Sequence, residues 1–139
     1  MSIERVFGIA GSALSAGSVR LNTVASNLAN ADTVSGTPEG AYRARAPIFS
    51  NVLQDQVAGA TSESVGVKVT GVVESTAQPR QAYQPDHPSA DDKGYVYYSN
   101  VNVMEELSNL ISASRSYQTN VDVMSTTKQL LLKTLELGS

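Results

Sequence analysis

The side chains best suited to metal binding gather in a proline-rich stretch, residues 78–94. His87 is the only histidine of the chain and lies close to Asp86, Asp91 and Asp92. Imidazole and carboxylate groups bind metals, but a single histidine among aspartates and prolines is more typical of a loop with turns. The sequence therefore predicts no metal site and no cofactor.

Serines are frequent, yet the sequence contains neither the pattern of a hydrolytic site nor that of a phosphate-binding loop. A Ser-His-Asp triad would have to use the same loop histidine, and the chain has no Gly-x-Ser-x-Gly turn. The glycines of GIAGSALSAG, residues 8–17, lack the Lys-Ser or Lys-Thr ending of a phosphate loop and fall within a helical pattern. We expect no enzymatic activity and no small-molecule substrate.

Composition narrows the classes of partner. The 139 residues carry a net charge of -3 and their basic residues are scattered, so we expect no nucleic-acid binding. The chain contains no cysteine, which excludes disulfides and thiolate metal sites. No apolar run approaches the roughly 20 residues of a membrane-spanning helix. A hydrophobic content of 41% suits one modest domain with one core.

The segment VFGIAGSAL, residues 6–14, has the apolar character of a secretory signal. A signal peptide begins with a positively charged region, whereas Glu4 here cancels the charge of Arg5. The helical spacing of apolar residues also continues through the position where cleavage would fall. We therefore expect that this segment stays in the mature chain and that no signal peptide is cleaved.

Both ends of the chain carry apolar residues at alternating steps of four and three, the heptad pattern of helices that pack along one another. At the N-terminal end the positions are Ile3, Phe7, Ala10, Leu14, Gly17, Leu21, Val24, Leu28 and Ala31. At the C-terminal end they are Val103, Leu107, Leu110, Ser114, Tyr117, Val121, Met124, Lys128, Leu131 and Leu135. Asn102 with Glu105 predicts a capped start of the second helix, and Gly138 predicts its end.

Between the helices the pattern changes to that of short strands. Val65, Val67 and Val69 alternate with glycine and polar residues, and residues 95–98 (YVYY) form a second β-prone run. Residues 78–94 hold three of the five prolines and are typical of an extended connector with turns. The middle of the chain is therefore expected to be a small β-rich insert.

These elements together predict the α+β fold class. The N- and C-terminal heptad helices are expected to pair as an antiparallel-type coiled coil, with the small β-rich domain inserted between them. Residues 1–33 and 101–139 would form the discontinuous helical core domain. Residues 34–100 would form the insert with its proline-rich connector.

Neither predicted helix has the charged face of a helix exposed to water. Residues 8–18 contain only Gly, Ala, Ser and two larger apolar residues, and residues 113–127 carry two charges. Asn22, Asn27 and Asn30 are mediocre helix formers, which suggests amides hydrogen-bonded to fixed partners. Helices from other copies of the chain would cover these faces. The alternative is a monomer whose Ser and Asn faces are solvated.

Four stretches of the chain together resemble the flagellar basal-body rod proteins of bacteria. They are GSALSAGSVRLNTVASNLANADT (11–33), HPSADDKGYV (87–96), SNVNVMEELSNLISASRSYQTNV (99–121) and KTLELG (133–138). The short length and the C-terminal ending bring the chain nearest to the proximal-rod type. Ser99 departs from the family pattern, in which proline is common before the Asn-Val-Asn block.

The resemblance implies a structural subunit of the basal body and no reaction. Such proteins stack with copies of themselves and with other rod proteins into a hollow helical rod, which crosses the periplasmic space and transmits motor torque. The resemblance also implies export by the flagellar type III apparatus without cleavage. Another axial protein of the flagellum is one alternative, and a small coiled-coil adaptor or export chaperone is another.

Subunit contacts are expected along both helices. On the first helix they are assigned to Ile3, Phe7, Leu14, Leu21, Asn22, Val24, Asn27, Leu28 and Asn30. On the second they are assigned to Leu107, Leu110, Ser114, Arg115, Tyr117, Val121, Met124, Leu131 and Leu135. Phe49 and Leu53 have the Phe-x-x-x-hydrophobic spacing of an export-gate motif in such subunits, with plain packing as the alternative.

Overall fold

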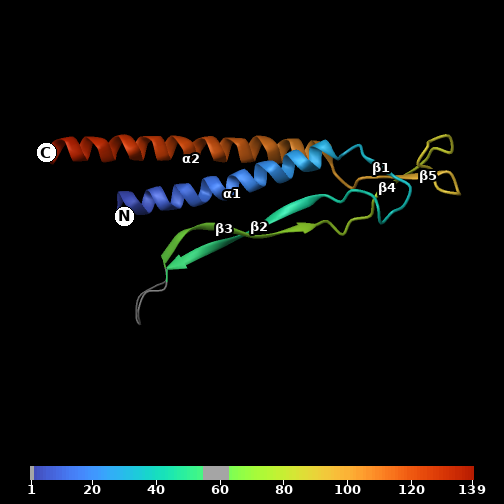
Figure 1. Cartoon of the computed structure of the whole chain (residues 1–139), viewed down its shortest axis with the longest axis horizontal. Coiled ribbons are helices and arrows are strands. Elements are labelled where there is room, and N and C mark those ends of the chain that lie inside the picture. The colour runs from blue at the N-terminus through green and yellow to red at the C-terminus, as the bar shows by residue number, and fades with distance from the viewer. Residues whose placement is uncertain (1, 55–62) are drawn as a thin grey trace.

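The computed structural model describes residues 2–54 and 63–139 and is elongated (Figure 1). In chain order its elements are α1 (Ile3–Ala29), β1 (Val34–Ser35), β2 (Arg45–Gln54), β3 (Glu63–Glu74), β4 (Arg80–Tyr83), β5 (Tyr95–Tyr98) and α2 (Val103–Leu137). The predicted α+β class is confirmed, because N- and C-terminal helices enclose antiparallel strands in the sequence. The division into two domains remains a prediction.

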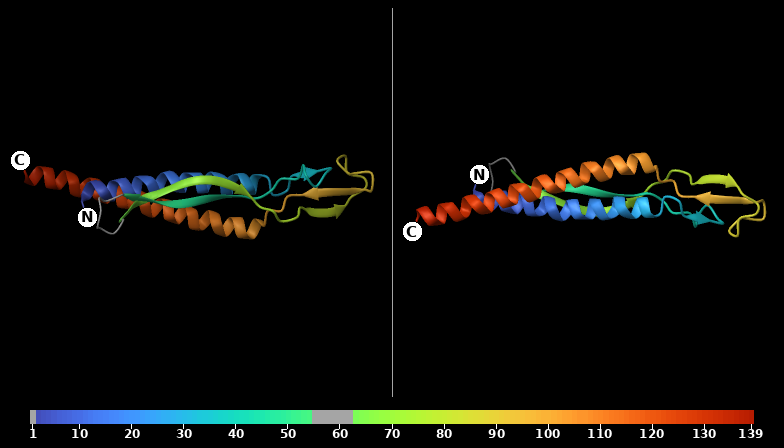
Figure 2. Two further views of the ribbon diagram at one scale, coloured as in Figure 1. Left: turned by 90° about the horizontal axis from the view of Figure 1, so that it is seen from below. Right: turned by 90° about the horizontal axis from the view of Figure 1, so that it is seen from above.

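Helices α1 and α2 lie side by side and run in opposite directions (Figure 1, Figure 2). At one end Nδ2 of Asn27 donates a hydrogen bond to Oε2 of Glu106 at 3.1 Å. Farther along, a Cβ added to Gly17 would lie 3.3 Å from Cδ2 of Tyr117, so the ring of Tyr117 packs against the backbone of α1. Both predicted helices and their contact are confirmed, whereas supercoiled heptad packing between them remains a prediction.

Local signals define both ends of α2. The side chain of Asn102 accepts hydrogen bonds from the backbone N–H groups of Met104 and Glu105 at 3.1 and 3.3 Å. These bonds satisfy donors that have no partner within the helix. At the other end the N–H group of Gly138 donates to the carbonyl of Thr134 at 3.1 Å. The predicted start and end of the second helix are confirmed.

Strands β2 and β3 pair antiparallel as a hairpin that lies along α1 (Figure 1). The predicted strand around Val65, Val67 and Val69 is part of β3, whereas the sequence pattern does not indicate its partner β2. In the described residues, the backbone of the hairpin lies closer to α1 than to α2, although side chains of all three elements line one cavity. The chain itself therefore covers α1 on two sides, where the sequence suggested neighbouring subunits.

A three-stranded sheet with the order β1-β5-β4 lies beyond the end of the helix pair (Figure 1). The predicted run of residues 95–98 is β5, and its Val96 is fully buried. Strand β4 falls within residues 78–94, where the sequence predicts a connector with turns. This segment begins as a strand because its residues pair antiparallel with β5, and the turns follow after β4.

The core consists of small side chains. The buried apolar residues are Ala10, Ala16, Val24, Ala31, Ala41, Val96 and Ala113. Small side chains let backbones approach closely but bury little apolar area each. Many larger apolar side chains consequently remain at the surface. Within the described ranges, no helix combines the length and the apolar character needed to cross a membrane.

Candidate functional site

The loop that contains the histidine and the aspartates is organised as a turn. Oδ1 of Asp91 accepts hydrogen bonds from the backbone N–H groups of Lys93 and Tyr95, both at 2.9 Å. The bond from Tyr95 is the main reason that the pKa of Asp91 lies below its ordinary value. Nδ1 of His87 accepts a hydrogen bond from the N–H group of Ser89 at 3.0 Å. These polar atoms therefore stabilise the loop backbone.

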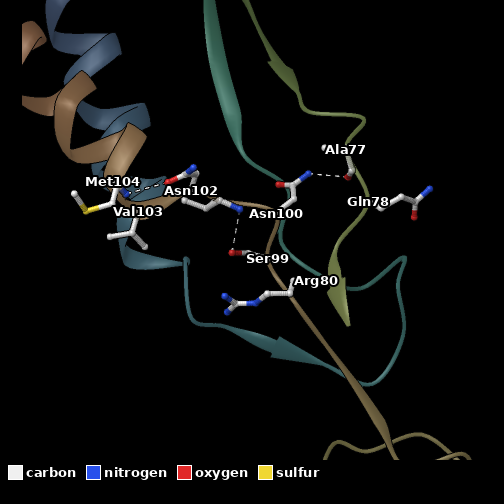
Figure 3. Close-up of a pocket in the computed structure, with 9 residues that line it drawn as sticks. Ala77, Gln78, Arg80, Ser99, Asn100, Asn102, Val103 and Met104 are labelled. Atoms are coloured by element: carbon white, nitrogen blue, oxygen red, sulfur yellow. Dashed lines mark hydrogen bonds between the residues drawn. The ribbon is translucent and has the colours of Figure 1, made fainter. Parts of the chain in front are cut away.

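A cavity of about 480 Å³ lies where the strands join α2 (Figure 3). Among its lining residues, Asn100 donates from Nδ2 to the carbonyl of Ala77 at 2.9 Å, and Asn102 caps α2. Ser99 is buried and donates from Oγ to the carbonyl of Ala31 at 2.6 Å. The residues that line this cavity therefore form the connection between the three-stranded sheet and the two helices.

The side chains assigned to subunit contacts on α1 differ in exposure. Val24 is buried, whereas Asn22 is exposed. The half-buried side chains are Ile3, Phe7, Leu14, Leu21, Leu28 and Asn30. Because α2 and the hairpin already cover two sides of α1, a neighbour can reach only the exposed parts of these side chains.

Asn27 joins three segments of the chain and is 1% exposed. Its Nδ2 donates to the carbonyl of Arg45 at 2.8 Å and to Oε2 of Glu106 at 3.1 Å. Its Oδ1 accepts from the N–H group of Arg45 at 2.9 Å and from the hydroxyl of Tyr42 at 3.0 Å. The predicted fixed partners exist, but they belong to the same chain. Because the start of β2 occupies that side of α1, little of Asn27 is left for a neighbouring subunit, and its assignment to subunit contacts remains a prediction.

The buried face of α2 is displaced from the predicted heptad. Leu110, Tyr117 and Met124 of that heptad are half-buried. The fully buried positions are instead Ala113 and Thr127, each one residue before a predicted position. A small side chain at these points lets α1 approach closely, so the larger apolar side chains of the helix point outward.

The outer surface of α2 carries many large apolar side chains among exposed polar and charged ones. We define it by the exposed large side chains Val103, Met104, Leu107, Ile111, Val121, Val123, Leu130, Leu131, Leu132, Leu135 and Leu137. Four of the assigned contact residues belong to this surface, namely Leu107, Val121, Leu131 and Leu135, and Ser114 and Arg115 are also exposed. The C-terminal turns of α2 extend past the start of α1 (Figure 2). Exposed apolar side chains in this number are typical of a surface that contacts another protein.

Phe49 and Leu53 lie on β2 and are 42% and 56% exposed. Phe49 also lines a cavity of about 170 Å³ between α1, α2 and the hairpin, together with Val67 of β3. Gly17 and Ala113 form other parts of the cavity wall. In the folded chain Phe49 therefore contributes to packing between the hairpin and the helices.

Comparison with known proteins matches both ends of the chain to one group. Residues 7–36 match the family described as "Flagella basal body rod protein", and residues 92–137 match "Flagellar basal body rod FlgEFG protein C-terminal". The chain is 52% identical over 138 residues to the flagellar basal-body rod protein FlgC of Yersinia enterocolitica, covering 99% of each chain. It is 49% identical over 139 residues to FlgC of Salmonella typhimurium (strain LT2), again covering 99% of each.

Proposed function

Since the chain belongs to the family of FlgC-type flagellar basal-body rod proteins and is a structural subunit of the rod, we propose that it builds the proximal rod and transmits motor torque there. The outer surface of α2 carries this proposal. A free chain exposes these leucines and valines to water, whereas packed neighbours would bury them. Torque then passes through many apolar contacts that are repeated in every subunit.

The helix pair forms the inner coiled-coil layer of the rod in this proposal. Close approach at Gly17 and Ala113 supports it, because small residues at a helix contact allow interdigitated packing. Each helix buries one of its faces against the other helix. The outer surface of α2 is then free to pack against helices of neighbouring subunits. A contact between unlike surfaces of identical chains generates an open helical assembly when its rotation does not close into a ring.

The proposed subunit contacts are the assigned residues that keep exposed atoms, without Asn27. On α2 the exposed ones are Leu107, Ser114, Arg115, Val121, Leu131 and Leu135, and Leu110, Tyr117 and Met124 contribute their accessible edges. On α1 they are Ile3, Phe7, Leu14, Leu21, Asn22, Leu28 and Asn30, while buried Val24 supports the helix pair. The partners are other copies of the chain and other rod proteins in the periplasmic space.

Deletion of the gene in the bacterium that encodes the chain tests this function. We expect loss of swarming and of complete rods, with both restored by the intact gene. Purified basal bodies should contain the chain with its N-terminal residues retained apart from Met1, because export by the type III apparatus does not cleave it. Mass spectrometry reads this end. A mature form beginning near Gly17 would contradict the export route, and basal bodies without the chain would contradict the function.

Phe49 and Leu53 are proposed to bind the export gate before the chain folds. Phe49→Ala should then reduce the amount of chain that leaves the cytoplasm by about tenfold, because one aromatic anchor often dominates a short binding motif. Ile48→Ala is the matched control, since Ile48 is the neighbouring residue and is 45% exposed in the folded chain. Immunoblots of cytoplasmic and exported fractions measure the effect. Equal export of the two variants would show that the spacing only serves packing.

A further inference from the structure

The β2–β3 hairpin meets α1 at one close contact. Oγ of Ser12 accepts a hydrogen bond from the N–H group of Val67 at 3.1 Å and donates to the carbonyl of Ile9 in its own helix at 2.8 Å. The hydroxyl therefore links a helix carbonyl to a strand amide. Val67 lies in β3 directly after Gly66, and the register with β2 shifts beside Gly66, between Val52 and Leu53.

Gly66 makes this contact possible. A Cβ at Gly66 would lie 2.6 Å from Oγ of Ser12, closer than such atoms approach, and 3.2 Å from Cβ of Ser12, which is a tight contact. Its φ of +156° is also rare for residues with a side chain. Gly71, in the same strand, differs in both respects, because a Cβ there would meet nothing within 4 Å. The strand thus carries one glycine that the contact requires and one that it does not.

Among the described residues, two further contacts hold the base of the hairpin. Asn27 holds the backbone of Arg45, and Oδ1 of Asn100, which lies just before α2, accepts from the N–H group of Ala44 at 2.7 Å. Asn27 is far along α1 from Ser12. The hydrogen bond to Ser12 therefore holds the part of β3 that lies away from the base of the hairpin, and it keeps this part in contact with α1.

We propose that Ser12 and Gly66 form a seating point that fixes the hairpin on α1, and that the subunit must have its hairpin seated to assemble. The second part rests on the proposed function. The seated hairpin covers α1 on one side, where Val72 lines a cavity against Val19 and Thr23 of α1, and Ile48 of β2 remains 45% exposed. An unseated hairpin would expose the covered face of α1 and displace β2 and β3, so two surfaces of the subunit would change together.

Hydrogen exchange of the Val67 amide in the purified chain tests the seat. Gly66→Ala should speed this exchange about tenfold or more, because the added methyl group pushes Ser12 away and breaks the hydrogen bond. Gly71→Ala should leave it near the parent value. Amides of β5 should stay unchanged in both variants, since its sheet lies beyond the end of the helix pair. Parent-like exchange of Val67 in Gly66→Ala would overturn the seating point.

A second variant separates the steric contact from backbone strain at Gly66. In a chain that carries Ser12→Gly, the side chain that would collide with the new methyl group is absent. Adding Gly66→Ala to that chain should therefore change the Val67 exchange by less than threefold, because the two residues act through one contact. An effect as large as in the parent background would show that strain alone is responsible and would overturn the role of Ser12.

Assembly is measured by counting complete rods in the deletion strain that expresses each variant. Immunoblots check that the variants reach similar cellular levels. Gly66→Ala should give at least about tenfold fewer complete rods than Gly71→Ala, which should match the parent chain. Parent numbers of rods from a variant with a released Val67 amide would overturn the requirement for seating while leaving the proposed function intact. Failure of the parent chain to enter rods would instead contradict the proposed function.

Discussion

Asn27→Leu is expected to lower the free energy of unfolding of the purified chain by about 3 kcal/mol. The substitution removes four hydrogen bonds and leaves the backbone N–H and carbonyl of Arg45 without their side-chain partner. It also places a leucine beside the carboxylate of Glu106 in a position that is 1% exposed. Leucine is the better helix former, but this gain in stability is smaller than the free-energy cost of leaving buried polar groups without hydrogen-bond partners.

Asn22→Leu is the matched control for this prediction. It makes the same chemical change on the same helix at an exposed position, so the effect should stay within about 0.5 kcal/mol. Urea denaturation followed by circular dichroism measures both variants. If Asn27→Leu is as stable as the parent or more stable, then Asn27 does not hold the start of β2 and the first turns of α2 together.

Leu135→Asp is expected to abolish rod assembly while sparing the free chain. Leu135 is 61% exposed on the outer surface of α2, so in the monomer the new carboxylate stays in water and costs within about 1 kcal/mol. In the rod the same carboxylate would be buried against a neighbour without a partner. That cost is several kcal/mol for each subunit and recurs at each repeat of the assembly.

Leu135→Met is the control, because it keeps an apolar side chain of similar volume and should support normal swarming. The measurements are swarming of the complemented deletion strain, the fraction of basal bodies with complete rods by electron microscopy, and urea denaturation of the purified variants. Complete rods built from Leu135→Asp would place this part of α2 in water and remove the basis of the proposed subunit contacts. Unfolding of the free variant would instead assign Leu135 to the stability of the monomer.

Several features of the chain follow from the sequence by itself, because each depends on residues close together along the chain. Three-and-four spacing of apolar residues predicts both helices, and Asn102 and Gly138 predict the ends of α2. Alternation at Val65 to Val69 predicts β3, since period two needs no knowledge of the partner strand. The rod family likewise follows from short blocks within the two helices and the loop before β5.

The tertiary structure decided which side of each helix is covered and by what. The spacing of residues on α2 allows more than one face of the helix to pack against α1. The face with the small residues Ala113 and Thr127 meets α1, because small side chains let the two helices approach closely. Strands β2 and β4 exist because they pair with β3 and β5, and pairing energy depends on a partner strand that local composition does not reveal. The asparagine in a helical segment predicted that the amide of Asn27 has fixed partners. Only the folded chain identifies these partners as Arg45, Tyr42 and Glu106, because they are distant in the sequence.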